Sequence, residues 1–300
     1  MMIEYNSGII KAKLNKSEKI LINNVSFSLN EKEILSIIGE TGSGKTIIAH
    51  SIMKLLPENV YSNGLSFIFN GKDLSNHKSI KKYLGKEIVY IPQSGLESLN
   101  PKITISKQID DSLKRNKIPR NRYLQYKHDL LSKVGFDNVE EILKKYPFEL
   151  SGGMGQKIVI MLASISNPKL IIADEPTNGL DVKAKNEIIG LLKEMFPLAA
   201  IILITHDISL VNESSKCIVL NKGIVMEQGK SKKILFCPKH PYTKSLISAL
   251  VENGMHESLV IRNVNSTCPF ANRCTKYQNS CNEDIPLQKN KFAIWRCIYD

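Results

Sequence analysis

Eight residues between positions 39 and 46 carry the pattern of a phosphate-binding loop. They read Gly39-Glu40-Thr41-Gly42-Ser43-Gly44-Lys45-Thr46 and stand between an apolar run and a helical pattern. Glycines let backbone N–H groups converge on phosphate oxygens, and the helix that follows adds its positive end. We expect Lys45 to contact the β- and γ-phosphates of ATP and the Thr46 hydroxyl to ligate Mg²⁺. This segment, the phosphate loop, predicts a nucleotide site.

A second apolar run ends in two adjacent carboxylates. Residues 170–173 are all apolar and predict a buried strand, and Asp174 and Glu175 follow it directly. Taken alone, such a pair is typical of an ordinary strand end. In a parallel sheet, however, this edge lies beside the phosphate loop, so Asp174 is expected to hold Mg²⁺, directly or through water. Glu175 is then placed to polarise an attacking water, which predicts hydrolysis as well as binding.

Further motifs lie around these two in a fixed order. They are Gln93, Leu150-Ser151-Gly152-Gly153-Met154-Gly155-Gln156-Lys157, Gly179-Leu180-Asp181 and Thr205-His206-Asp207. With the phosphate loop and the paired carboxylates, this set resembles the ATP-binding subunit of an ABC transporter over residues 35–210. The implied fold is α/β: a P-loop NTPase cassette of the ABC type, with a mostly parallel sheet, an antiparallel β subdomain and a helical subdomain.

The resemblance implies a role for each of these motifs. Residues 151–153, the Ser-Gly-Gly turn, would cap the γ-phosphate of ATP bound to an opposite subunit, because a helix N-terminus attracts anions. Gln93 would contact Mg²⁺ and the attacking water. His206 would contact the γ-phosphate and help to position Glu175, and Asp181 would lie at the dimer seam.

Two departures from the family pattern stand out. A long polar or basic residue is usual at the position of Gly155, and arginine at that of Lys157, so the capping site is expected to be looser. The family also places an aromatic residue near the N-terminus to stack on adenine. Residues 10–15 contain none, and Tyr5 is a weak candidate for that role.

The carboxyl end carries a second resemblance. Residues 236–243 read Phe236-Cys237-Pro238-Lys239-His240-Pro241-Tyr242-Thr243 and are followed by Leu246 and Leu250. This segment is similar to one in the subfamily that imports oligopeptides, dipeptides or nickel. In that subfamily two different ATPase chains pair, with two permeases and an extracytoplasmic solute-binding protein. We therefore expect a heterodimer rather than a homodimer of ATPase subunits, located at the cytoplasmic face of the membrane. The cargo expected for the transporter is a peptide, nickel or a metal chelate.

Four of the six cysteines fall in the last 33 residues. They are Cys268, Cys274, Cys281 and Cys297, and the segment 268–297 is called the cysteine tail. It is similar to a tail that binds a [4Fe–4S] cluster in some members of the subfamily. Four thiolates in a short segment suit such a clamp, whereas the spacing lacks the paired cysteines of zinc sites. Iron–sulfur, zinc and reduced thiols stay open. Cys217 and Cys237 are expected to be buried as small apolar residues.

The elements that position these motifs follow from hydrophobic periodicity. Strands alternate with helices, except between about 100 and 150, where polar helical patterns dominate. Expected strands lie within 1–38 and at 65–69, 87–91, 170–173, 200–204 and 217–220, and expected helices at 46–56, 103–114, 122–134, 139–145, 154–166, 182–196 and 207–215. We expect an ATP-binding domain over 1–228, with a helical subdomain at about 94–152, and a C-terminal extension over 229–300.

Composition bounds the alternatives. The 300 residues include 41 Lys and Arg against 29 Asp and Glu, a net charge of +12 that suits anionic partners. No apolar run reaches the ~20 residues that span a bilayer, and no signal peptide is visible, which predicts a cytosolic chain. A soluble ABC ATPase associated with nucleic acid usually carries two cassettes or a long coiled coil. An exporter ATPase would lack the C-terminal segment, so we expect an importer subunit and no nucleic-acid partner.

Overall fold

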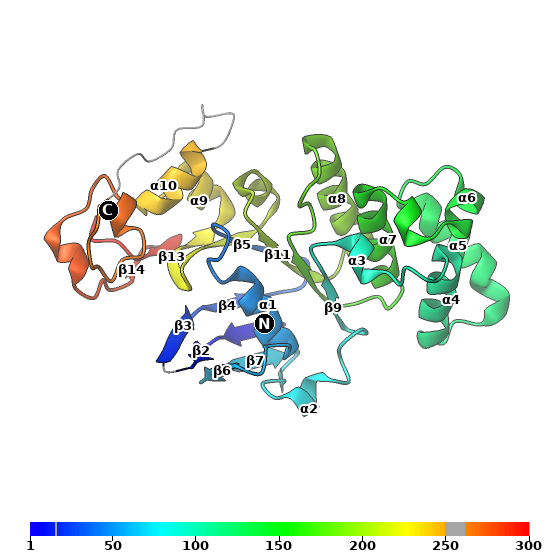
Figure 1. Ribbon diagram of the computed structural model, residues 1–300, viewed down its shortest axis with the longest axis horizontal. Coiled ribbons are helices and arrows are strands. Elements are labelled where there is room, and N and C mark those ends of the chain that lie inside the picture. The colour runs from blue at the N-terminus through cyan, green and yellow to red at the C-terminus, as the bar shows by residue number, and fades with distance from the viewer. Residues whose placement is uncertain (16, 250–261, 300) are drawn as a thin grey trace. The chain divides into compact units, whose positions relative to one another are not determined.

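The computed structural model of the protein describes residues 1–15, 17–249 and 262–299. These residues form two units (Figure 1). The first consists of Met1–Lys82 and Ile202–Asp300, and the second of Tyr83–Ile201. The phosphate loop and the cysteine tail therefore belong to the first unit, and the Ser-Gly-Gly turn to the second.

Two small antiparallel sheets form near the N-terminus of the first unit. Their strands are β1 (Ile3–Asn6), β2 (Ile9–Leu14), β3 (Ser17–Asn23), β4 (Ser26–Leu29), β6 (Val60–Asn63), β7 (Ser66–Phe69) and β8 (Lys72–Asp73). One sheet has the order β4-β1-β7-β8, and the other β3-β2-β6. Ile3 and Tyr5, on alternate positions of β1, are buried, as in a sheet with one face on the core. This confirms the predicted antiparallel β subdomain.

A larger sheet carries the phosphate loop. In the first unit it contains β5 (Ile34–Ile38), β12 (Lys216–Asn221), β13 (Ile224–Lys230), β14 (Gln288–Lys289) and β15 (Ala293–Trp295), with the order β14-β15-β13-β12-β5. β5 and β12 are parallel, with Ile37 opposite Ile218, and both strands are almost entirely buried. β11 (Ala200–Thr205) crosses from the second unit into the first. The phosphate loop leads from β5 into α1 (Lys45–Met53).

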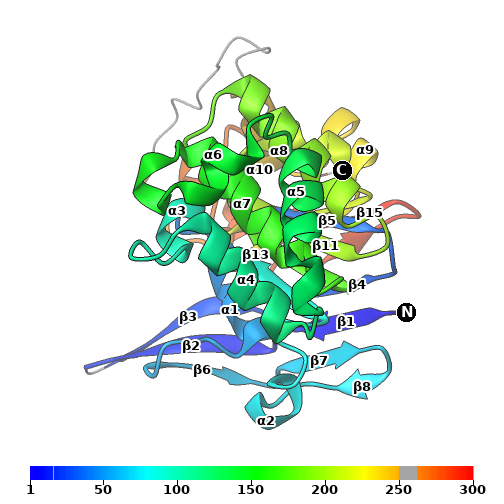
Figure 2. The same ribbon diagram turned by 90° about the vertical axis from the view of Figure 1, so that its right-hand side faces the viewer.

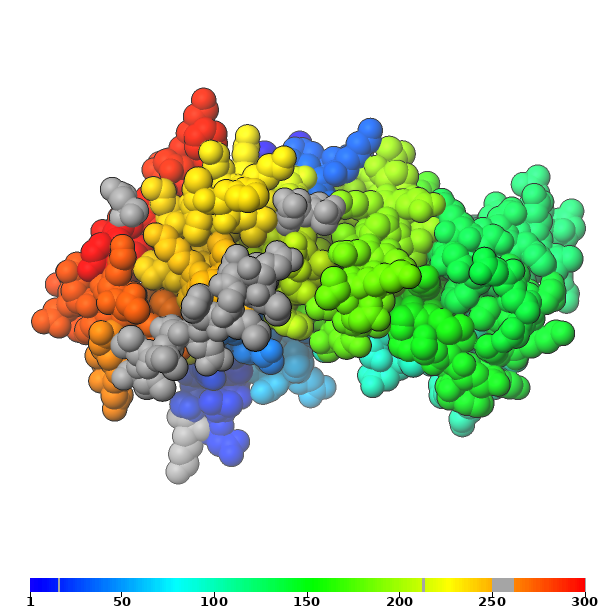
Figure 3. Space-filling view, turned by 90° about the horizontal axis from the view of Figure 1, so that it is seen from above, coloured from blue at the N-terminus to red at the C-terminus, as the bar shows by residue number. Residues whose placement is uncertain are grey.

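The C-terminal residues complete this sheet. α9 (Ser231–Phe236) and α10 (Pro241–Ser248) pack on β13, and β15 pairs antiparallel with β13. Figure 3 shows the cysteine tail, in orange and red, beside these helices in yellow. Tyr242, Phe270 and Cys274 share one buried cluster with Ile38 of β5. Short helices complete the unit: α2 (His77–Ile80) and the 3₁₀ turns η3 (Ile208–Glu213), η5 (Ala271–Arg273) and η6 (Asn279–Asn282).

The second unit is largely helical (Figure 2). Its elements are β9 (Ile88–Ile91), α3 (Gly95–Ser98), α4 (Ile105–Arg115), η1 (Arg120–Arg122), α5 (Tyr123–Lys133), α6 (Val139–Lys144), η2 (Pro147–Glu149), α7 (Gly152–Ser164), β10 (Leu170–Asp174) and α8 (Val182–Met195). β9 and β10 form a parallel pair. In α4, Ile105, Ile109 and Leu113 are buried at a spacing of four residues, which gives one apolar face. The predicted α/β class and helical subdomain are confirmed.

Several expectations from the sequence need correction. The helix expected over 207–215 is the 3₁₀ turn η3, which Asp207 caps by accepting the backbone N–H of Ser209. Cys217 is buried as predicted, whereas Cys237 directly follows α9 at the surface and is exposed. The boundary predicted between 228 and 229 stays a prediction. Among the described residues, no helix is both long and apolar enough to cross a membrane.

α3 and α7 approach each other closely at a glycine. A Cβ atom on Gly95 would lie 2.7 Å from the backbone nitrogen of Gln156 in α7. The Gln156 side chain also donates to the carbonyl of Pro92, at 3.5 Å. A backbone atom cannot move aside as the end of a flexible side chain can, so the contact between α3 and α7 requires glycine at position 95. Gly190 in α8 has open space around its Cβ position.

These two glycines predict opposite effects of the same substitution. Gly190→Ala should raise the free energy of unfolding by about 0.5–1 kcal/mol, because alanine loses less backbone entropy in a helix. Gly95→Ala should lower it by about 1–3 kcal/mol, because the new methyl group overpacks the α3–α7 contact. Urea unfolding of both variants measures the difference. Equal stability of the two would contradict the close approach.

Candidate functional site

The phosphate loop is held against two neighbouring strands by glycines. A Cβ atom on Gly39 would lie 2.1 Å from the carbonyl oxygen of Leu220, at the end of β12. Gly44 has φ +101°, and a Cβ there would meet the Ile22 side chain of β3 at 2.5 Å. Neither position accepts another residue without displacement. The two glycines thereby let the loop backbone lie directly against these strands.

A cavity of 360 Å³ opens at this loop. The Lys45 ammonium is buried and donates to the carbonyls of Gly39 and Glu40, at 2.8 and 3.2 Å. The Ser43 hydroxyl is buried, and the described residues offer it no hydrogen-bond partner. An orphaned hydroxyl and a buried cation suit a phosphate group, so the residues present fit a bound nucleotide. The cavity is lined by Lys19, Ile20, Leu21, Glu40, Thr41, Gly42, Ser43, Gly44, Ile47, Asn221 and Lys222.

Among the described residues, the wall of this cavity outside the loop contains no aromatic side chain. It is formed by Lys19, Ile20 and Leu21 of β3, together with Ile47, Asn221 and Lys222. Tyr5, the candidate from the sequence for stacking on adenine, lies elsewhere: it is buried, shares a 2.6 Å hydrogen bond with Ser51, and packs on Phe27 at 4.9 Å. Its place in the core of the β subdomain rules out the stacking role. Ile20, Leu21 and Ile47 are the apolar surface that this cavity offers to a base.

The paired carboxylates lie at the end of β10 in the second unit. Both Asp174 and Glu175 are buried, and Asp174 accepts a 3.0 Å hydrogen bond from the Tyr90 hydroxyl of β9. Burial, and after it the charge of Asp174, raises the pKa of Tyr90, which keeps this hydroxyl a donor. Glu175 has φ +48°, which is uncommon for a residue with a side chain and is a conformation found at functional sites.

The Ser-Gly-Gly turn forms the N-terminus of α7. The Ser151 hydroxyl caps the helix by accepting the N–H of Met154 at 3.3 Å, and Ser151 is exposed. The two departures from the family pattern have structural partners. A Cβ on Gly155 would lie 2.4 Å from the Leu96 side chain of α3, and Lys157 forms an ion pair with Glu187 of α8 at 3.3 Å. Gly155 therefore allows α7 to pack closely on α3, and Lys157 links α7 to α8.

The remaining predicted residues are exposed at the ends of elements. Gln93 follows β9, and Asp181 caps α8 by accepting the N–H of Ala184 at 2.8 Å. His206 follows β11 in the first unit. The structure thus places residues 40–44 of the phosphate loop around one cavity. Gln93, Asp174, Glu175, Asp181 and the Ser-Gly-Gly turn belong to the second unit, where each stands at a strand end or a helix start.

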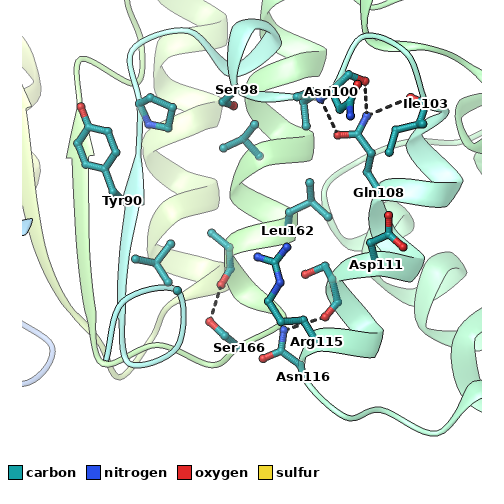
Figure 4. Close-up of a pocket in the computed structure, with 17 residues that line it drawn as sticks. Tyr90, Ser98, Asn100, Ile103, Gln108, Asp111, Arg115, Asn116, Leu162 and Ser166 are labelled. Atoms are coloured by element: carbon teal, nitrogen blue, oxygen red, sulfur yellow. Dashed lines mark hydrogen bonds between the residues drawn. The ribbon is translucent and has the colours of Figure 1, made fainter. Parts of the chain in front are cut away.

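A second cavity, of 450 Å³, lies within the second unit (Figure 4). Its wall combines Tyr90 and Pro92, which precede Gln93, with side chains from residues 98–116, with the C-terminal half of α7 from Val159, and with Ser166 just after that helix. The Gln108 amide donates to the carbonyls of Asn100 and Ile103, which fixes the segment before α4. The Arg115 side chain extends into the space (Figure 4). This cavity, the helical-unit groove, was not predicted from the sequence.

The thiols of the cysteine tail are largely buried. Cys274, Cys281 and Cys297 are buried and Cys268 partly so, and none of them forms a disulfide. Burial, with the neighbouring thiols adding to it, raises the pKa of Cys268 to about 11. Four thiols are the donor type of an iron–sulfur or zinc site. Their positions do not fit one: in the described parts of the chain, no three His, Cys, Asp or Glu residues are placed to hold a metal ion.

Sequence reasoning missed three residues that support the phosphate loop. The N–H of Gly223 donates to the Ser43 carbonyl at 2.8 Å, and a Cβ on Gly223 would lie 2.0 Å from the Leu21 carbonyl. The other two, Tyr242 and Arg273, contact Glu40. Gly223 carried a local signal as a glycine between two apolar runs, and Tyr242 lies in the motif of residues 236–243, whereas Arg273 carried none.

Comparisons with known proteins agree with this geometry. Residues 22–178 match the family described as ABC transporter, and residues 226–281 match the oligopeptide/dipeptide transporter C-terminal region. The chain is 37% identical to the oligopeptide transport ATP-binding protein OppD of Bacillus subtilis (strain 168), over 86% of this chain and 75% of that protein. It is 40% identical to the dipeptide transport ATP-binding protein DppD of Escherichia coli (strain K12), over 77% and 72% of the two chains.

Solved structures share the fold. The ATP-binding cassette MJ0796, in a dimeric post-hydrolysis state bound to ADP and Pi, superposes with a TM-score of 0.66 at 23% identity. The alignment covers 77% of this chain and 99% of that cassette. The predicted fold class is confirmed. The chain belongs to the family of ABC transporter ATP-binding subunits, and its cassette is followed by the C-terminal region of oligopeptide and dipeptide transporters.

Proposed function

We propose that this ATPase drives the import of peptides as a peripheral subunit at the cytoplasmic face of a membrane. The observation that carries the proposal is the oligopeptide/dipeptide C-terminal region directly after an ABC cassette with a complete phosphate loop. The relatives reported above are named for oligopeptide and dipeptide transport, which favours peptides over nickel or metal chelates. The same C-terminal region speaks against an exporter ATPase or a nucleic-acid-associated ATPase.

In this proposal each predicted site residue has a part in hydrolysis. The loop amides and Lys45 hold the β- and γ-phosphates, and Thr46 and Asp174 would hold Mg²⁺, which would supply charge neutralisation at the transferred phosphoryl group. Oxygen donors are the ligands that Mg²⁺ prefers. Glu175 orients and deprotonates the attacking water, while Gln93 and His206 position that water and the γ-phosphate. Ile20 and Leu21 support the adenine.

The Ser-Gly-Gly turn acts on the ATP of a second ATPase subunit. Its exposure and its place at the start of α7 support this role, because an uncovered helix N-terminus is an anion site. Asp181 lies at the seam between the two subunits. ATP then joins two cassettes, and its greater affinity for the closed pair supplies the work of transport. By analogy with the subfamily, the second subunit is a different chain.

Permease subunits dock in the helical-unit groove. The groove joins the strand that leads to Gln93 with the helices of residues 98–116, so a permease segment seated there is linked to the water-positioning residue. A helix or loop of a membrane subunit is the occupant we propose, because the relatives are transport ATP-binding proteins. The solute-binding protein delivers the peptide on the far side.

The [4Fe–4S] hypothesis for the cysteine tail rests on donor type and on the resemblance to the tail of some subfamily members. The described positions of the thiols do not support it, and no step of the ATPase passes through them. Visible absorption and iron content of anaerobically purified protein test this hypothesis separately.

Glu175→Gln should slow ATP hydrolysis at least ~10²-fold, because it removes the general base. ATP should still bind, since the phosphate loop is unchanged. Phosphate release and nucleotide titration measure the two effects, and Glu194→Gln, an exposed glutamate of α8, is the control. Near-normal turnover of Glu175→Gln would remove the residue from this role.

Ser151→Ala, made in the Glu175→Gln background, should weaken ATP-dependent association of two ATPase subunits about tenfold, because a hydroxyl to the γ-phosphate is lost. Analytical ultracentrifugation with and without ATP, on this chain alone and with its partner subunit, measures association. Ser164→Ala at the other end of α7 is the control. The loss of the Ser151 cap also costs about 1 kcal/mol of stability, so unfolding is measured in parallel. Unchanged association would contradict the capping role.

Arg115→Glu should reduce copurification of the permeases and the peptide-stimulated ATPase of the assembled transporter several-fold, on the scale of about 1 kcal/mol for a rim charge. Lys114→Glu is matched to it, because both residues lie in the last turn of α4 and only Arg115 lines the helical-unit groove. If both variants assemble equally well, the permease does not use this groove.

A further inference from the structure

The first side chain of the phosphate loop is engaged by the cysteine tail. Glu40 directly follows Gly39 and lines the nucleotide cavity. Its two carboxylate oxygens each accept from Nη2 of Arg273, at 2.8 Å. The two residues are 233 positions apart, and Arg273 stands in η5, immediately before Cys274.

A second contact fixes the backbone of the same residue. The N–H of Glu40 donates to the Tyr242 hydroxyl at 3.1 Å, and Tyr242 is fully buried in α10. The Phe270 ring lies 5.3 Å from that of Tyr242, and the Arg273 guanidinium stands 5.2 Å above Phe270. Tyr242, Phe270 and Arg273 thus form one packed set, the loop anchor, which holds both the backbone and the side chain of Glu40.

Charge gives this contact a consequence for nucleotide binding. A carboxylate beside a triphosphate opposes its binding, since like charges repel over several ångströms even in a solvated site. The Arg273 guanidinium neutralises Glu40 and holds its carboxylate in one position. Both side chains are about 40% exposed, at 41% and 42%, so salt screens part of the effect.

We propose that Arg273 is a positioning residue for ATP, which acts through Glu40 by keeping that carboxylate neutralised and fixed at the edge of the nucleotide cavity. The inference rests on ATP binding at the phosphate loop. It adds a role for the cysteine tail that requires no metal and no change in the thiols. It also predicts that removal of the Arg273 charge weakens ATP binding, whereas removal of the Glu40 charge strengthens it.

A charge cycle on the full chain tests the proposal. Arg273→Gln should weaken ATP binding about tenfold at low salt, because an uncompensated carboxylate then faces the triphosphate. ADP, with one phosphate fewer, should lose less, and raised salt should reduce the loss. Glu40→Gln should tighten ATP binding, because the Arg273 charge is left unopposed. The double variant should return to within about twofold of the original affinity, because both charges are removed together and the effects of substitutions at two residues in contact are coupled.

Isothermal titration with ATP and ADP measures these affinities, and Lys276→Gln is the matched control. Lys276 is an exposed cation of the same tail that lies over the Tyr299 ring, so its removal reports the general loss of charge. KM should follow affinity while kcat stays constant.

Three results would overturn the inference: ATP affinity unchanged in Arg273→Gln, weaker binding in Glu40→Gln, or a double variant as weak as Arg273→Gln. The last would mean that Arg273 only supports the fold, and Glu40→Gln decides the question even if Arg273→Gln unfolds. Failure of the unsubstituted chain to bind ATP would instead remove the proposed function.

Discussion

The close approach of the phosphate loop to β12 and β3 is the constraint on which the first unit depends. Gly39 touches the Leu220 carbonyl, Gly44 touches Ile22, and Gly223 touches Leu21, each at a distance that excludes a Cβ atom. Two glycines of the loop itself and one from the turn between β12 and β13 therefore make these close contacts. Backbone packed on backbone leaves few ways for the loop to move, which is what an anion site made of amide groups requires.

The second unit shows a comparable constraint between α3 and α7. Gly95 rests on the backbone of Gln156, whose side chain reaches the carbonyl of Pro92. Gln93 and the helix that begins with the Ser-Gly-Gly turn are consequently parts of one packed region. A displacement of the segment after β9 is therefore transmitted to the N-terminus of α7, as two packed rigid elements move together.

How much could be predicted from the sequence depended on whether the information was local. The phosphate loop and the apolar run ending in Asp174 and Glu175 are contiguous patterns, so periodicity and residue type were sufficient. The Arg273–Glu40 pair joins residues 233 positions apart and leaves no periodic trace. Tyr5 illustrates the opposite error: its position near the N-terminus fitted a stacking role, but burial against Phe27 and Ser51 decides its place. Cys237 was misassigned because a helix end is set by tertiary packing.

The pairing of β15 with β13 has a consequence for how the chain can be divided. β13 would otherwise end the sheet with unpaired N–H and C=O groups, and Gly229 lets the backbone near Phe292 lie against it. An open edge of that kind is a template for pairing with other chains. A shortened protein that ends near residue 230 would thus expose the unpaired edge of β13 and should aggregate more readily. Pairing with β15 therefore protects this edge of the sheet.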